Sequence, residues 1–122
     1  MQLKINDKTY NFNFGVRFVA ALDKAYGGAI NGVNFGMGLT ALVPQLAQFD
    51  TAGLAKVLYT AGYVNSPRPT INQIYDYIDD PKTNLDKVFE MVQNELETSN
   101  ATKGNVKMLV DINKKAEKKT DK

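Results

Sequence analysis

Apolar residues recur at helical spacing along residues 84–97. Side chains three and four positions apart share one face of an α-helix, because a helical turn contains about 3.6 residues. The apolar positions on this face are Leu85, Val88, Phe89, Val92 and Leu96. Thr83 and Asp86 form a variant of the capping box, and Pro81 prevents an earlier helix from continuing. The segment therefore predicts an amphipathic helix that buries one face.

The first fourteen residues alternate between apolar and polar side chains, which is typical of a β-hairpin. Asn6 and Asp7 supply a two-residue turn between the strands. The expected cross-strand pairs are Ile5 with Lys8, Leu3 with Tyr10, and Met1 with Phe12. An isolated hairpin is marginal in water, so we expect a helix to cover its apolar face.

Five further segments carry apolar residues at helical spacing. Their expected inward residues are, in order, Phe18, Val19, Leu22 and Tyr26; Phe35, Leu39, Leu42, Leu46 and Phe49; Leu54, Val57, Leu58 and Ala61; Ile71, Ile74, Tyr75 and Ile78; and Val106, Leu109, Val110 and Ile112. Pro44 is expected to kink the second segment or to split it into two short turns, because proline removes a helical hydrogen bond, and a kink is favoured. Thr70 and Gln73 form a capping box for the fourth segment. The glycine-rich residues 27–34 predict a flexible loop, since they lack the spacing of phosphate-binding loops.

These elements predict an α+β fold that is mostly α, with an N-terminal β-hairpin followed by about five or six short helices. Residues 1–112 are expected to form a single helical domain that includes the hairpin. Beyond Ile112 no apolar side chain is larger than alanine. Residues 113–122 are therefore expected to be a lysine-rich flexible tail, disordered in isolation.

The chain contains no cysteine and no histidine. This composition removes disulfides, thiolate nucleophiles, the usual zinc ligands and the side chain best suited to proton transfer near neutral pH. Asp76, Asp79 and Asp80 are close in sequence, but the helix dipole disfavours acids at a helix C-terminus, and the spacing of a calcium loop is missing. We therefore predict no enzyme activity, no catalytic residue, no cofactor and no metal site.

Charge and hydropathy restrict the partners and the cellular location that we predict for the protein. The net charge is only +2, and residues 103–122 hold seven lysines against three acids. This basic end has no interleaved arginine or aromatic residue, which argues against a nucleic-acid surface. No apolar run approaches the ~18 residues of a membrane span, and Lys4 and Asp7 interrupt any N-terminal targeting signal. We expect a cytoplasmic protein with no membrane contact.

Several segments together resemble the tail assembly chaperones of long-tailed (siphovirus-type) phages or prophages of Gram-positive bacteria. They are the Asn-Phe-Asn-Phe-Gly ending of the hairpin, Asn34-Phe35-Gly36-Met37-Gly38-Leu39, Arg68-Pro69-Thr70 with the acidic helix after it, and Leu85-Asp86-Lys87-Val88-Phe89 through Ser99-Asn100. The resemblance spans residues 1–107, in order.

The resemblance implies a small, mostly helical, non-catalytic protein made in the host cytoplasm and absent from the mature virion. Such a protein binds the tape measure protein, keeps it soluble and helps recruit tail tube subunits. Family members are commonly accompanied by a longer form of themselves, made by a ribosomal frameshift, and this chain would be the shorter product.

The candidate partner-binding residues come from apolar patterning alone. They are Phe35, Met37, Leu39, Tyr59 and Met91. Methionine can serve an adaptable binding groove, although Met37, Met91 and Met108 are more typical of core filling. Incompletely covered helix faces also predict a homo-oligomer. The alternative function is a small cytoplasmic adaptor or regulatory module whose basic tail contacts nucleic acid, with a hydrolytic enzyme as a more distant alternative.

Overall fold

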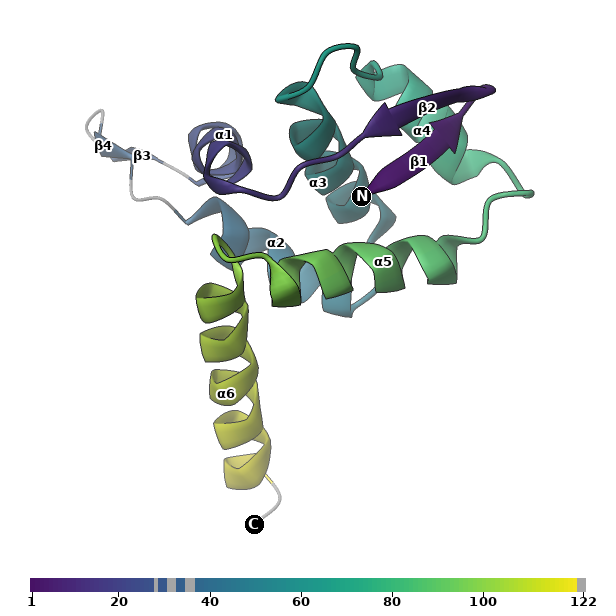
Figure 1. Ribbon diagram of the computed structural model, residues 1–122. Helices are drawn as coiled ribbons and strands as arrows, with labels where there is room; N and C mark the ends of the chain where they lie inside the picture. Colours follow the sequence, from purple (N-terminus) through teal and green to yellow (C-terminus); the bar gives the residue numbers. More distant parts are fainter. Residues whose placement is uncertain (28, 31–32, 35–36, 121–122) are drawn as a thin grey trace.

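The computed structural model describes the backbone of residues 1–27, 29–30, 33–34 and 37–120, and the side chains of residues 1–27 and 37–111. The elements in chain order are β1 (Gln2–Ile5), β2 (Lys8–Asn11), α1 (Val16–Tyr26), β3 (Ala29–Ile30), β4 (Val33–Asn34), α2 (Gly38–Ala47), α3 (Thr51–Tyr63), α4 (Ile71–Asp79), α5 (Leu85–Thr98) and α6 (Lys103–Thr120). The predicted fold class is confirmed, because an N-terminal hairpin precedes a mainly helical chain (Figure 1).

The N-terminal hairpin has the predicted register. Leu3 lies opposite Tyr10 and Ile5 opposite Lys8, while the Phe12 N–H donates to the Met1 carbonyl over 2.8 Å. The turn residues Asn6 and Asp7 have φ angles of 52° and 63°, the left-handed values that a tight hairpin turn requires. The apolar face of the hairpin is buried, and α4 packs against β1 (Figure 1).

Helix α3 lies at the centre of the helical layer and packs against α1, α2 and α4 (Figure 1). Its inward residues are those that the pattern predicted: Leu54, Val57, Leu58 and Ala61 are all buried. Asp50 caps the helix by accepting the Gly53 N–H over 3.1 Å. The Asn13 N–H donates to the Ala61 carbonyl over 3.0 Å, which ties the end of the hairpin to this central helix.

Helix α5 buries the predicted apolar stripe. Val88, Phe89, Val92 and Leu96 are buried and Leu85 is half-buried, and each fully buried side chain of this kind contributes roughly 1.5–3 kcal/mol to stability. The predicted cap is wrong by one residue. Asn84 accepts the Lys87 N–H over 3.1 Å, whereas the Thr83 hydroxyl donates to the Tyr77 carbonyl over 2.7 Å and joins α5 to α4.

The capping box of α4 is confirmed. The Thr70 hydroxyl accepts the Gln73 N–H over 3.1 Å, and the Gln73 side chain accepts the Thr70 N–H over 2.8 Å. Ile74 and Ile78 are buried as predicted, but Tyr75 is 49% exposed. Tyr75 lies at the edge of the apolar face, and its polar hydroxyl favours a position in contact with water.

Helix α2 is a single helix that contains Pro44. Leu39, Leu42 and Leu46 are buried as predicted, whereas Phe49 is 60% exposed. The helix ends at Ala47 and Phe49 has a φ angle of 58°, so the helical spacing that would have turned Phe49 inward no longer applies. Phe35, which was expected on the same face, lies outside the described residues.

The stretch predicted to be a flexible loop contains two short strands. β3 pairs with β4 in antiparallel register, with Ala29 opposite Asn34 and Ile30 opposite Val33. β-Branched residues favour strands, and Asn-Gly between two such runs is a strong sequence signal for a hairpin turn. The sequence therefore contained a signal for this pair of strands, in Ile30, Val33 and the Asn-Gly dipeptide between them.

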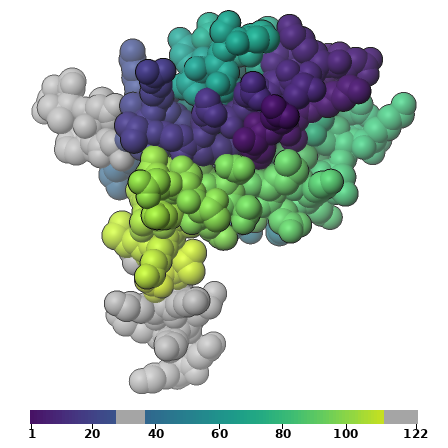
Figure 2. Space-filling model, viewed as in Figure 1, coloured from purple at the N-terminus to yellow at the C-terminus, as the bar shows by residue number. Residues whose placement is uncertain are grey.

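Helix α6 leaves the body of the molecule at a steep angle to α5 (Figures 1 and 2). Its first turn is anchored, because Val106 is buried and the buried Thr102 hydroxyl donates to the Leu96 carbonyl over 2.6 Å. Val110 is 41% exposed, contrary to prediction, since α6 has already moved away from the core at this position. The helix continues past Ile112 to Thr120 through strong helix formers such as lysine, alanine and glutamate. The division between a domain at 1–112 and a separate tail stays a prediction.

Across the described residues, none of the helices combines the length and the apolar character that a membrane span requires.

Gly38 permits a close approach of α1 and α2. Its N–H donates to the Asp23 carboxylate over 2.9 Å, and an added Cβ would lie 2.5 Å from the Leu22 carbonyl oxygen and 2.9 Å from the Asp23 nitrogen. We expect Gly38→Ala to lower the free energy of unfolding by about 1–3 kcal/mol, because backbone atoms must move apart. The matched control is Gly104→Ala in α6, where an added Cβ has nothing within 4 Å.

Urea unfolding of both variants checks this prediction. Gly104→Ala should be neutral or stabilising by up to about 1 kcal/mol, because alanine favours the helix. If Gly38→Ala stabilised the protein as Gly104→Ala does, the close approach of α1 and α2 would be wrong.

Candidate partner-binding groove

Helices α1 and α3 border an open surface groove with a volume of about 390 Å³. The groove is lined by Ala21, Lys24, Ala25, Tyr26, Tyr59, Thr60 and Tyr63. The two alanines have short side chains, and the three tyrosine rings supply the aromatic part of the lining. We call this feature the tyrosine groove.

Helical geometry places the aromatic residues of the groove together. Tyr59 and Tyr63 are four residues apart on α3, so they share one face, and their ring centroids are 6.2 Å apart. Tyr26 is the last residue of α1. Tyr63 is 47% exposed, while Tyr26 and Tyr59 are half-buried. The groove therefore presents aromatic surface that the core leaves uncovered.

The phenol of Tyr26 is in a partly desolvated environment. Burial raises the pKa of Tyr26 above its ordinary value, and the nearby phenols of Tyr75 and Tyr59 raise this pKa further. The phenols of Tyr59 in α3 and Tyr75 in α4 thus lie close enough to Tyr26 in α1 to affect its pKa. Tyr26 remains protonated at neutral pH and can donate a hydrogen bond as well as accept one.

Cations border the groove and contact its aromatic rings. The ammonium nitrogen of Lys56 lies 5.4 Å from the centroid of the Tyr26 ring, and the guanidinium carbon of Arg68 lies 4.1 Å from that of Tyr63. Arg68 also donates to the Tyr63 carbonyl over 3.1 Å, which holds the guanidinium in place. Lys24 lies in the last turn of α1 and lines the groove. None of the lining residues that the structure describes is acidic.

The structure describes four of the five predicted partner-binding residues, and it does not bring these four together. Tyr59 lines the groove, Met37 is 51% exposed just before α2, and Met91 is half-buried at the edge of α5. Leu39 is 2% exposed, so it belongs to the core and offers no surface to a partner in this fold. Phe35 lies outside the described residues. The core-filling role predicted for Met37 is wrong, and Met108 is likewise exposed.

Sequence reasoning missed most of the groove. Tyr63 lies one helical turn after Tyr59, and this spacing was the available signal. Arg68 follows α3 across a turn, and its position over the Tyr63 ring depends on how that turn folds. Lys56 and Tyr26 come from different helices, so no local pattern joins them.

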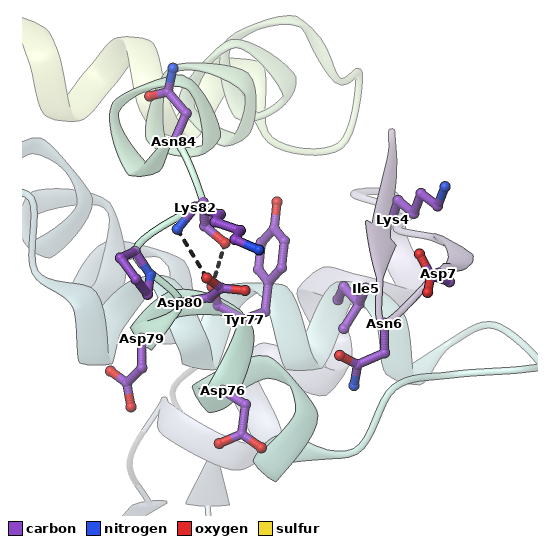
Figure 3. A pocket seen from close by; sticks show the side chains of 12 residues that line it. Lys4, Ile5, Asn6, Asp7, Asp76, Tyr77, Asp79, Asp80, Lys82 and Asn84 are labelled. Carbon is purple, nitrogen blue, oxygen red and sulfur yellow. Dashed lines mark hydrogen bonds between the residues drawn. The ribbon is translucent and has the colours of Figure 1, made fainter.

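A surface hollow of about 860 Å³ lies between the hairpin turn and the connection from α4 to α5. Asp76, Asp79 and Asp80 are among its lining residues, and their side chains point in different directions (Figure 3). Asp80 accepts the Lys82 N–H over 2.9 Å and so shapes the turn. Among the residues described, no three metal-ligating side chains are grouped closely enough to hold an ion.

A small helical domain with an exposed groove of tyrosines and cations has the composition of a protein-binding surface, since tyrosine and arginine are enriched at interfaces and their hot spots. The sequence of residues 2–115 matches the family described as "Phage tail assembly chaperone protein, TAC". The chain belongs to this family of phage tail assembly chaperones. Comparisons with curated proteins and with solved structures gave no significant match.

Proposed function

We propose that this tail assembly chaperone binds the tape measure protein, keeps it soluble and helps to recruit tail tube subunits. The observation that supports the proposal most strongly is the family match over residues 2–115, which makes the protein a tail assembly chaperone. A long helical protein that waits for assembly exposes apolar helix faces, and such faces aggregate unless another protein covers them. Covering them requires a binding surface and no covalent chemistry.

The tyrosine groove is the surface that we assign to this role. A groove between two helices suits a partner helix that inserts apolar side chains. Tyrosine rings provide large, rigid contact area at a low cost in conformational entropy, and their hydroxyl groups can bond to polar groups of the partner. The proposed contact residues are Tyr26, Tyr59 and Tyr63, of which only Tyr59 was identified from the sequence.

Co-expression with the tape measure protein tests the proposed function. We expect the tape measure protein to be mostly insoluble when it is expressed alone and to move into the soluble fraction with the chaperone. The two proteins should then co-purify through a tag on the tape measure protein.

A tape measure protein that stays insoluble beside a folded chaperone would contradict the proposal. Salt-dependent retention of the chaperone on DNA, without any rescue of the partner, would instead favour the adaptor alternative.

A further inference from the structure

Two of the three cations around the tyrosine groove have aromatic rings as their partners, where protein surfaces more often supply carboxylates. Lys56 and Arg68 lie over the rings of Tyr26 and Tyr63. Lys24, Lys56 and Arg68 form no ion pair with a carboxylate within the part of the chain that the structure describes. Their charges are therefore available to a bound partner.

Acidic side chains near the groove in sequence are engaged elsewhere. Asp23 precedes Lys24, but its carboxylate accepts the Gly38 N–H over 2.9 Å at the contact with α2. Asp76 follows Tyr75, but it lines the hollow beside the hairpin turn. The groove is thus apolar along its floor and positively charged at its edges.

We infer that the groove selects an amphipathic helix whose apolar face is flanked by aspartate or glutamate residues. The apolar face would pack on Tyr59, Tyr63 and Ala25, and acidic residues at its two edges would meet Lys24, Lys56 and Arg68. Complementary charges of this kind set the orientation of a bound helix and exclude helices with basic edges. The inference rests on the proposed function and names the kind of segment that the groove accepts.

A protein helix fits this groove better than a nucleic acid does. Bases bind to tyrosines by stacking on a free ring face, whereas Lys56 and Arg68 already lie over faces of Tyr26 and Tyr63. Three cations, Lys24, Lys56 and Arg68, border the groove among the residues that the structure describes. Binding to nucleic acid depends mainly on many phosphate contacts. The alanines of α1 provide apolar surface that a phosphate backbone cannot use.

The test compares two triple substitutions that change the net charge equally. The groove variant carries Lys24→Glu, Lys56→Glu and Arg68→Glu. The control variant carries Lys4→Glu, Lys8→Glu and Lys107→Glu, which are exposed and do not line the groove. Lys8 also lies over a tyrosine ring, 5.5 Å from the centroid of Tyr10, so the control also loses a cation–π contact.

Each variant is co-expressed with the tagged tape measure protein, and circular dichroism checks that it folds. We expect the groove variant to retain about a tenth or less of the wild-type co-purification, because each edge contact turns from attraction into repulsion. The control variant should co-purify like the wild type. If the groove variant does not fold, the single change Lys24→Gln at an exposed position replaces it and should still reduce co-purification in low salt.

The outcomes separate the two proposals. If the wild-type protein does not rescue the partner, the proposed function fails. If the wild type rescues the partner and the groove variant does so equally well, or if both variants fail alike, the charge selection is wrong and the function can stand. Release of the partner by nuclease treatment would show that nucleic acid occupies the groove and would overturn the inference.

Discussion

Replacement of Phe89 by alanine is expected to lower the free energy of unfolding by about 3–5 kcal/mol, the usual cost of removing a buried phenylalanine. Phe89 is 2% exposed and belongs to the apolar stripe of α5. Its ring packs edge-on against Phe49, with 5.4 Å between the centroids. A small domain has a total stability of about 5–15 kcal/mol, so this single change should remove a large fraction of it.

Phe49 provides a matched control, because it is the other member of the same aromatic pair. It is 60% exposed and has a φ angle of 58°, which is strained for a bulky residue. We expect Phe49→Ala to cost less than about 1 kcal/mol, and Phe49→Gly to recover part of that cost by relieving the backbone.

Urea unfolding monitored by circular dichroism measures the three variants under identical conditions. Equal losses for Phe89→Ala and Phe49→Ala would contradict the burial that the structure assigns to this pair.

The parts of the fold that sequence predicted well depend on short-range periodicity. The α5 stripe, the register of Leu3 with Tyr10 and the capping box at Thr70 all follow from residues within a few positions of each other. Hydrophobic burial and local hydrogen bonds favour the same local structure in these three elements. The pattern therefore determines the structure there.

The wrong predictions arise where an element ends or where a residue lies at the edge of a face. Thr83 and Asn84 are both good caps. The Thr83 hydroxyl donates to the Tyr77 carbonyl, and Asn84 caps the helix, which the local sequence pattern did not show. Phe49 was placed inside because periodicity cannot show that α2 stops at Ala47. Tyr75 fits an apolar stripe, but a tyrosine at an edge can expose its ring as readily as bury it.

Most of the candidate site could not be predicted from the sequence, because its residues come from separate elements. Tyr26, Tyr59 and Arg68 come from α1, α3 and the connector after α3, and their proximity depends on the packing of α1 on α3. Leu39 was selected from apolar patterning, which finds core residues and surface residues equally well. Distinguishing them required the exposed fraction of each side chain.

Removal of both aromatic walls of the groove is expected to have the largest effect on function. Tyr59→Ala combined with Tyr63→Ala should weaken binding of the tape measure protein at least about 30-fold, since one interface hot spot alone contributes about 2 kcal/mol or more. The fold should survive, because Tyr63 is 47% exposed and Tyr59 is half-buried. Phe49→Ala is the control, since it removes an exposed aromatic ring outside the groove and should leave binding unchanged.

Hydrogen exchange locates the bound partner most directly, by comparing the free chaperone with its complex with the tape measure protein. The proposed groove predicts slower exchange in α1 around residues 21–26 and in α3 around residues 56–63 on complex formation. The Tyr59→Ala, Tyr63→Ala variant should show little of this protection. Protection confined to α5 and α6, with α1 and α3 unchanged, would contradict the assignment of the tyrosine groove as the partner-binding site.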